Sequence, residues 1–414
     1  MDPGKPATTG NERLPFDVLV QVFEYYPLNE STRWPVETLR LVCKAWNITA
    51  LQCSPLWARF NIDLSQSNTG TFWLRRLPVR LQMCGPNQPL HIDIRYSLPD
   101  QSQWPFSKKA WDAMEQIRSK SVQSTVPLLL NILAGENGRL CARWETLRLE
   151  LDRGVEFLNE DLAGLTYPMP LLISLYLSVQ MSRGGLVIFP NLPSIRSITT
   201  NVCNLSNYPD ASHATRIELR DMCCWDNGRS MKFTSVQYLS ISRSGGDILH
   251  HREYPTLRTL CLEECHHAVR LMEAEMPRLE NLIVVFLATY WLSHASQLRA
   301  VARVRVLHLF GQEHWERPTV RSVLSQLLNA FSSLQTLVVN EYVLSFLIED
   351  RETWGHLFEE DSATQVFLRT RSIRRHLFDE ENETQVSFSS TEDGDKRLTR
   401  GDKDSDGILG GIAS

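Results

Sequence analysis

The stretch Leu257-Arg-Thr-Leu260-Cys-Leu262 carries the spacing of apolar residues that decides the fold. In this stretch an apolar residue is followed by two other residues, and then by two apolar residues separated by one position. The same spacing occurs nine times, and the middle residues of successive copies lie 19 to 30 positions apart. Such a recurrence predicts an internal repeat. The copies are residues 144–149, 172–177, 195–200 (which ends on a threonine), 214–219, 236–241, 257–262, 279–284, 304–309 and 334–339.

Each copy ends in an alternation of apolar and other residues, which is the period of a half-buried strand. A single copy cannot bury its apolar side chains, whereas stacked neighbours bury a continuous core. We therefore expect parallel strands with their connections on the outer side, a solenoid of the α+β or α/β class. An ordinary α/β domain with similar strands is the alternative. The regular spacing and the lack of a glycine-rich phosphate loop favour the repeat.

Three helices are predicted upstream of the repeats. Pro15 suits a first helical position, and apolar residues at helical spacing extend the helix to about Tyr26. Trp34-Pro35 predicts a second helix start, and Ser54-Pro55 predicts a short third helix capped by the serine. The second helix then has one apolar stripe at Leu39, Val42, Cys43, Trp46 and Ala50, and another at Leu41, Ala45 and Ile48.

This helical unit is too small to bury all of its apolar side chains within itself, so part of its surface must meet the rest of the chain or a partner. The ordered set Leu14-Pro15, Leu19, Val22, Phe23, Leu41-Val42-Cys43-Lys44-Ala45-Trp46 and Leu56-Trp57 resembles an F-box, most closely those of fungal F-box-like proteins. The resemblance implies a three-helix fold that binds the Skp adaptor of a Skp-cullin-F-box ubiquitin ligase. Leucine-rich repeats behind such a unit are a known arrangement of the family.

The resemblance assigns adaptor binding to nine positions, and we expect Trp57 to point inward while Leu14, Pro15 and Val42 lie on the outer surface. The nine positions are Leu14, Pro15, Leu19, Val22, Phe23, Leu41, Val42, Cys43 and Trp46.

The chain is expected to divide into six segments. The third of them, a junction, is expected to contain helices at 72–84, 108–117 and 126–133 and a first strand at 90–94. The last is dense in charged and hydroxyl residues, which cannot form a core. The segments are a flexible arm at 1–11, an F-box-like three-helix domain at 12–60, the junction at 61–138, a leucine-rich-repeat-like solenoid at 139–342, a C-terminal helix or cap at 343–368 and a disordered tail at 369–414.

A second binding surface follows from strand geometry, because side chains between the inward apolar residues point to the opposite, concave face. In the later repeats many of these residues are apolar, and an exposed face avoids such residues unless something covers it. We expect either that residues 343–358 fold back over this face, which we favour, or that a substrate protein binds there. The predicted substrate-binding residues are Arg216, Glu218, Arg220, Tyr238, Ile283, Val285, Val306, His308 and Phe310.

Motifs for catalysis or metal binding are weak. No Gly-x-Ser-x-Gly elbow, histidine-glutamate zinc helix or phosphate loop occurs, so we expect no enzyme activity and no cofactor. Asp402, Asp404 and Asp406 imitate the start of a calcium loop, but its twelfth position is Ala413. The cluster of Cys261, Cys265, His266 and His267 near Cys223-Cys224 does not have the spacing of a standard zinc site. Cys265, like Cys203, is expected to satisfy backbone groups in a repeat turn.

The composition of the chain limits the kinds of partner that it is expected to bind. The chain is 43% hydrophobic and 22% charged, with a net charge of -5, which argues against nucleic acid as the main partner. The longest apolar run has 11 residues, Leu282 to Leu292, which is too short to span a membrane. Nine scattered cysteines indicate reduced thiols, and residues 1–11 lack the apolar run of a signal peptide. We therefore expect a soluble protein of the cytoplasm, the nucleus or both.

These observations lead to one principal hypothesis for function. The resemblance implies a substrate receptor in which the helical unit binds a Skp-type adaptor, and through it a cullin-RING ligase, while the repeats bind a protein substrate for ubiquitin-dependent degradation. The alternative is a leucine-rich-repeat scaffold whose N-terminal helices only cap the solenoid, because every solenoid needs a terminal cap.

Overall fold

The structure is a computed structural model, and it divides by contacts into two compact units, Met1–Ala211 and Ser212–Ser414, each of which is described by itself. The described residues are 15–25, 35–66, 68–98, 107–151, 155–158, 160–181, 192–201, 213–220, 234–243, 253–265, 275–285, 303–311, 324, 328–329, 331–349, 353, 357, 364–369, 383–390 and 396–401.

The first unit begins with four helices: α1 (Phe16–Tyr25), α2 (Pro35–Arg40), α3 (Lys44–Gln52) and the single-turn α4 (Ser54–Trp57). Our prediction of one helix from residue 35 to residue 50 was wrong, since a turn at 41–43 separates α2 from α3. Cys43 has an extended backbone with φ of -159°, and its Sγ accepts a hydrogen bond from the backbone N–H of Trp46 at 3.5 Å. The thiol therefore caps a new helix, and the two apolar stripes expected along a continuous helix do not exist. Cys53, not Ser54, is the N-cap of α4.

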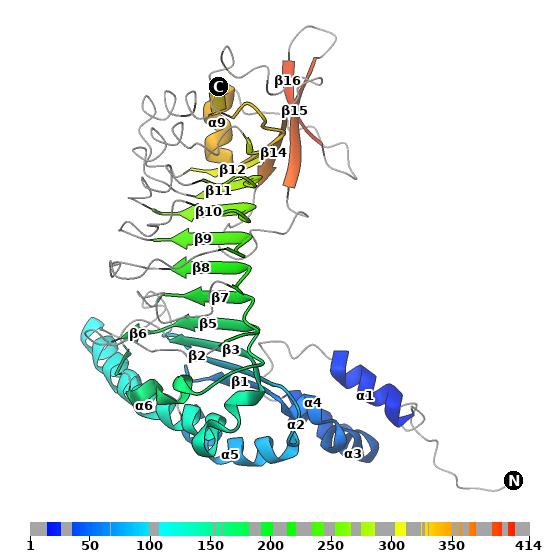
Figure 1. The fold of residues 1–414 in the computed structure, drawn as a ribbon, viewed down its shortest axis with the longest axis vertical. Helices are drawn as coiled ribbons and strands as arrows, with labels where there is room; N and C mark the ends of the chain where they lie inside the picture. The colour runs from blue at the N-terminus through cyan, green and yellow to red at the C-terminus, as the bar shows by residue number, and fades with distance from the viewer. Residues whose placement is uncertain are drawn as a thin grey trace, which may run out of the picture. The chain divides into compact units, whose positions relative to one another are not determined.

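A parallel sheet follows in the first unit, with strands in chain order: β1 (Arg59–Asp63), β2 (Leu90–Tyr96), β3 (Trp144–Leu151), β5 (Ser174–Ser178) and β7 (Ser197–Thr200). Helix α5 (Thr69–Met83) connects β1 to β2, and α6 (Lys108–Ala134) connects β2 to β3. The two helices pack against each other along the sheet (Figure 1). A small pair, β4 (Glu156–Phe157) and β6 (Gln180–Met181), and three short 3-10 turns, η3 (Glu136–Gly138), η4 (Cys141–Arg143) and η5 (Glu160–Thr166), complete the described part of this unit.

Helix α6 was expected as two helices, and it is a single one with Pro127 inside. Val126, Leu129, Leu130 and Leu133 are fully buried, so packing on the sheet outweighs the hydrogen bond that proline cannot donate. Strand β1 was not predicted at all.

The second unit continues the same pattern. Its parallel strands are β8 (Arg216–Arg220), β9 (Tyr238–Ser242), β10 (Thr259–Glu263), β11 (Asn281–Val285), β12 (Val306–Phe310), β13 (Thr336–Val339) and β14 (Gln365–Arg369). Helix α9 (Glu341–Glu349) connects β13 to β14. Antiparallel strands β15 (Glu383–Ser390) and β16 (Lys396–Gly401) extend the sheet.

The C-terminal segments therefore differ from our expectation. Residues 343–368 do not form only a helix or cap, because β14 at their end joins the parallel sheet. The region 369–414 was expected to be disordered, and the structure places β15 and β16 within it.

The register of the strands confirms the spacing found in the sequence. Leu147 pairs with Leu175, and Leu175 pairs with Ile198. In the second unit the middle residues pair in an unbroken series: Ile217, Leu239, Leu260, Leu282, Leu307 and Leu337. Each of these side chains is at most 1% exposed, so the middle residues form the core of each unit. The fold is thus α/β, with a parallel sheet in each unit.

The series also extends beyond the nine copies. Phe60 pairs with Ile92, which pairs with Leu147, and Leu337 pairs with Val366 at the other end. Phe60 and Val366, which extend the series at its two ends, are buried like the middle residues of the predicted copies.

Hydroxyl groups in the turns before several strands link neighbouring repeats. The Oγ of Ser194 donates to the carbonyl of Pro170 at 2.6 Å, and the Oγ1 of Thr256 donates to that of Val236 at 2.9 Å. Thr364 makes the same kind of bond to Leu334 at 2.9 Å. Each bond reaches back to the preceding repeat and fixes the spacing between the two strands.

Candidate protein-docking surfaces

Helix α1 has one buried and one exposed apolar stripe. Leu19 and Phe23 are four positions apart and only 1% exposed, and the Phe23 ring packs edge-on against Trp46 of α3 with centroids 5.1 Å apart. Val18 and Val22 form the other stripe and are 37% and 44% exposed. The sequence pattern placed Leu19, Val22 and Phe23 on a single face, whereas in the structure only Leu19 and Phe23 are buried and Val22 is exposed.

The turn between α2 and α3 also carries exposed apolar side chains. Leu41 is 85% exposed and Val42 is 50% exposed, and Ile48 on α3 is 44% exposed. We define the docking patch as Phe16, Val18, Val22, Leu41, Val42 and Ile48, all of them exposed apolar side chains of the N-terminal helices.

The predicted adaptor-binding positions therefore separate into two groups. Pro15, Val22, Leu41 and Val42 lie at the surface, and Cys43 and Trp46 are half-buried. Leu19 and Phe23 are inside, where they hold α1 against α3, so in this conformation they support the patch without forming it. Leu14 lies outside the described residues. Trp57 points inward as predicted, at 3% exposed, and its Nε1–H donates to the carbonyl of Ala50 at 2.7 Å.

A buried arginine lies beneath the N-terminal helices. Arg80 of α5 is 6% exposed, and its guanidinium carbon lies 5.8 Å from the Trp57 ring, 5.5 Å from the Phe60 ring and 5.3 Å from the Trp73 ring. Its Nη2 donates to the carbonyl of Arg59 at 3.1 Å. Burial lowers the pKa of Arg80, and the nearby negative charge of Glu37 opposes that shift. Arg80 could not be predicted from the sequence, because a lone arginine on a helix gives no signal there.

On the sheet of the first unit, Arg148 of β3 is held by both an ion pair and an aromatic ring. The Arg148 guanidinium donates to Glu150 Oε2 through Nε at 3.1 Å and through Nη2 at 2.6 Å, and it lies 4.4 Å from the ring centroid of Tyr176. The hydroxyl of Tyr176 donates to the other carboxylate oxygen of Glu150 at 3.1 Å. Arg95 and Asp93 on the neighbouring strand form a second pair at 2.6 Å. These opposite charges make the described face of this unit polar and balanced.

The second unit repeats this arrangement with four of the predicted substrate-binding residues. Arg216 donates to Glu218 Oε1 at 2.6 Å and lies 4.2 Å from the ring centroid of Tyr238, its register partner. Arg220 donates to the other oxygen of Glu218 at 2.9 Å. Burial raises the pKa of Tyr238, with Cys261 and Glu218 adding to the shift. The structure therefore brings these four residues together as one polar cluster.

The apolar part of the second unit's face is covered. Cys261, Ile283, Val285, Phe310 and Val338 form a cluster in which every side chain is at most 2% exposed, with Tyr238 and Phe367 packed against it. Val306 and His308, also predicted to bind substrate, are half-buried. The expectation that residues 343–358 fold back over this face is not met by their described part, because α9 is the connection between β13 and β14 and contributes no residue to the cluster.

Turn residues satisfy backbone groups as expected for Cys265. Its Sγ donates to the carbonyl of Ile241 at 3.2 Å. Asn340 does the same with an amide, since its Nδ2 donates to the carbonyl of Gly311 at 2.9 Å and its Oδ1 accepts from the N–H of Val343 at 3.1 Å. Asn201 accepts from the N–H of Val179 at 2.9 Å. Neither asparagine was predicted, because each directly follows its strand, whereas Cys265 lies two positions beyond the end of β10.

Most of the remaining candidates for metal binding lie outside the described residues, namely Cys223-Cys224, His266-His267 and the acidic segment 402–413. Cys203, which was expected to satisfy backbone groups in a turn, also lies outside them. Within the described ranges no group of three or more His, Cys, Asp or Glu side chains is placed to hold a metal ion.

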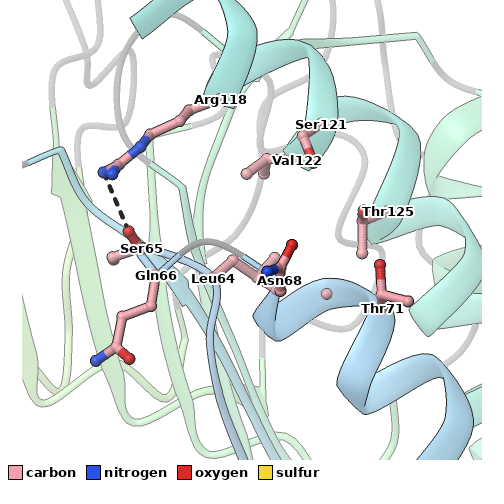
Figure 2. A pocket seen from close by; sticks show the side chains of 10 residues that line it. Leu64, Ser65, Gln66, Asn68, Thr71, Arg118, Ser121, Val122 and Thr125 are labelled. Carbon is pink, nitrogen blue, oxygen red and sulfur yellow. Dashed lines mark hydrogen bonds between the residues drawn. The ribbon is translucent and has the colours of Figure 1, made fainter. Parts of the chain in front are cut away.

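A small cavity of about 90 Å³ lies between the start of α5, the end of β1 and α6 (Figure 2). Arg118 extends from α6 to the carbonyl of Ser65, with Nη1 and O 3.3 Å apart. Among the described residues that line the cavity there is no carboxylate, histidine, cysteine or lysine, so these residues do not supply the pair of titratable groups that acid–base catalysis needs. Its lining residues are Leu64, Ser65, Gln66, Asn68, Gly70, Thr71, Arg118, Ser121, Val122 and Thr125.

Comparison of the sequence with protein-family models and with curated proteins finds no match. Among the helices that the structure describes, none combines the length and the apolar character needed to cross a bilayer.

Proposed function

We propose that this chain is a substrate receptor of a Skp-cullin-F-box ubiquitin ligase. In this proposal the N-terminal helices are an F-box-like unit that docks a Skp-type adaptor, and the parallel strands are an irregular leucine-rich-repeat solenoid that binds a protein substrate. The chemistry of ubiquitin transfer belongs to other subunits, so the chain itself needs only two binding surfaces.

The observation that carries the proposal is the docking patch. Four of the positions that match the F-box pattern, Pro15, Val22, Leu41 and Val42, lie at the surface of the N-terminal helices. Leu41, at 85% exposed, projects from a turn that the Cys43 cap holds in place. Six exposed apolar side chains on so small a helical unit favour a protein-interaction site.

A pull-down with a purified Skp-type adaptor tests the proposal. The double variant Leu41→Ser/Val42→Ser removes apolar contacts from the patch without touching a buried side chain, and we expect it to lose binding. Val79→Ser is the matched control, because Val79 is 59% exposed on α5 outside the patch and should bind like the wild type. Absence of adaptor binding by the wild type contradicts the proposal.

The alternative function is a leucine-rich-repeat interaction scaffold in which the N-terminal helices are only a terminal cap. Contacts of α4 with β1, together with the burial of Leu56 and Trp57, are what a cap requires. A cap does not require the exposed side chains of the docking patch, which is why we place it second. Under this alternative, neither the wild type nor the Leu41→Ser/Val42→Ser variant binds the adaptor.

A further inference from the structure

The turn between α2 and α3, residues 41–43, carries two side chains of the docking patch, and we call it the docking turn. Leu41 and Val42 are 85% and 50% exposed, so the protein covers little of their surface. Their backbone N–H groups donate to carbonyls of α2, that of Leu41 to Thr38 at 3.0 Å and that of Val42 to Leu39 at 3.4 Å. These bonds extend from α2 alone. The direction of the two side chains relative to α3 therefore depends on the rest of the turn and on its flanks.

A hydrogen bond between two side chains spans the docking turn. Arg40 is the last residue of α2, and Asn47 lies in α3. Nε of Arg40 donates to Oδ1 of Asn47 at 2.9 Å, and both side chains are half-buried. A hydrogen bond from an ionised donor is stronger than one between neutral groups. The bond therefore joins the two ends of the turn across its base.

Arg40 also contacts α4. Its guanidinium carbon lies 5.9 Å from the ring centroid of Trp57, within the range of a cation–π contact. Trp57 is 3% exposed, and its Nε1–H donates to the carbonyl of Ala50 on α3 at 2.7 Å. The ring is thus fixed against the same helix that carries Asn47. One side chain at the end of α2 is therefore oriented by both α3 and α4.

Other contacts near the docking turn act on one helix only. The Sγ of Cys43 accepts from the N–H of Trp46 at 3.5 Å, which sets the start of α3, and sulfur is a weak acceptor. Leu39, at 3% exposed, holds α2 in the core. The bond from Arg40 to Asn47 differs from both, because it joins the helix before the turn to the helix after it.

We propose that Arg40 is a positioning residue of the docking patch, and that its bond to Asn47 holds the docking turn in the arrangement that a partner recognises. A surface that is ordered before binding loses less conformational freedom when the partner arrives. The bond therefore strengthens docking although neither residue belongs to the docking patch. The partner is the Skp-type adaptor, and this part of the inference rests on the proposed function.

Hydrogen exchange of the full chain tests the bond without any partner. Asn47→Ala removes the acceptor, and alanine has a higher helix propensity than asparagine, so the substitution does not weaken α3 by itself. We expect the amides of Leu41 and Val42 to exchange about 3- to 10-fold faster, which is the effect of losing one hydrogen bond. The amides of α6 near Leu129 should exchange at the wild-type rate. Unchanged exchange in the docking turn overturns the proposal.

Asn47→Asp separates the bond from other effects of changing this residue. Aspartate keeps an oxygen within reach of Arg40 and adds a charge opposite to that of the guanidinium. We expect the docking turn to exchange at the wild-type rate or more slowly. Exchange as fast as in Asn47→Ala would mean that the oxygen at this position does not hold the turn, and the proposal would be wrong.

The double variant Arg40→Met/Asn47→Ala tests whether the two residues act as a pair. Methionine keeps an unbranched apolar side chain beside the Trp57 ring and removes the donor. We expect exchange in the docking turn of the double variant to stay within about twofold of that in Arg40→Met alone, because the bond is already lost. A further increase as large as the one caused by Asn47→Ala alone contradicts the pairing.

The affinity for a purified Skp-type adaptor is the second measurement. We expect Asn47→Ala to weaken binding about 3- to 10-fold, although every side chain of the docking patch is intact, and Asn47→Asp to restore it. Asn131→Ala is the matched control, since it makes the same change at an exposed position of α6 and should bind like the wild type. Faster exchange in Asn47→Ala with unchanged affinity overturns the role in docking. A wild type that does not bind the adaptor contradicts the proposed function, while the exchange experiment still decides whether Arg40 holds the turn.

Discussion

The guanidinium of Arg148 lies 4.4 Å from the ring centroid of Tyr176, its register partner on the next strand. The same relationship recurs in the second unit between Arg216 and Tyr238, at 4.2 Å. In both units the arginine is also held by a glutamate two positions further along its own strand. In each unit, stacking and ion pairing hold the same partly exposed arginine side chain in place on the sheet.

Tyr176→Leu should therefore destabilise the chain more than Tyr176→Phe. Phenylalanine keeps the stacked ring and loses only the hydroxyl bond to Glu150, whereas leucine loses both. A partly exposed cation–π contact contributes about 0.5–1 kcal/mol, so we expect a difference of that size in the free energy of unfolding. Urea denaturation of the two variants measures it, and equal stabilities contradict the contribution of the ring.

Leu260→Ala should be severely destabilising. Leu260 is 0% exposed and lies between Leu239 and Leu282 in the paired series. Removing a buried leucine side chain costs about 2–5 kcal/mol, because the cavity that remains collapses only in part. Leu171→Ala is the control, since Leu171 is 47% exposed and should change stability by no more than about 0.5 kcal/mol. Thermal unfolding compares the two, and similar melting temperatures are incompatible with a core at Leu260.

The stability of the folded chain should fall at high pH. Burial raises the pKa of the Cys141 and Cys261 thiols to about 12, from an ordinary value of 9.0. Above pH 9.0 the unfolded chain loses these protons while the folded chain keeps them, so the unfolded state is favoured progressively up to about pH 12. Burial also raises the pKa of Tyr254, which acts in the same direction. Guanidinium midpoints at pH 8 and pH 10 test this, and Cys261→Ala should reduce the difference between them.

Cysteine alkylation should distinguish the described thiols. Cys43 is half-exposed, whereas Cys141 and Cys261 are buried and protonated at pH 8. The thiolate is the reactive form, so iodoacetamide should modify Cys43 in the folded chain and the other two only after unfolding. Peptide mass spectrometry of the treated chain shows which cysteines are modified first, and early modification of Cys261 contradicts its burial.

Much of the strand core could be predicted from spacing alone. Within each unit the middle residue of one sequence copy is a register partner of the next, because a period of two fixes which side chains face inward. Strand β1 was missed because its alternation rests on only two apolar residues, Phe60 and Ile62. The sequence copies identified where strands lie, but the first strand of the sheet has no upstream copy with which to compare it.

Helix boundaries could be predicted less well, for two opposite reasons. The break between α2 and α3 depends on the thiol of Cys43 acting as a cap, a role in which serine, threonine, asparagine and aspartate are the usual residues. The expected break between residues 117 and 126 did not occur, because Ser119 and Val122 are buried there and α6 continues through the stretch. Local preferences failed at both places, where packing or an unusual cap determined the outcome.

The docking patch shows what sequence periodicity can and cannot separate. Leu19, Val22 and Phe23 all match one helical face, but only a neighbouring helix decides which of them is covered. Phe23 is buried with its ring against Trp46 of α3, while Val22 stays exposed. Contacts across elements, such as those of Arg80 with the rings of Trp57 and Phe60, leave no trace in local spacing.

The apolar cluster of the second unit has a consequence for how that unit unfolds. Strands in a simple stack hold only their immediate neighbours, so such a stack can fray from either end. The side chains from Tyr238 on β9 to Phe367 on β14 bind six consecutive strands together on the face opposite the leucine core. These strands have buried apolar side chains on both faces of the sheet, so they should unfold together as one cooperative unit.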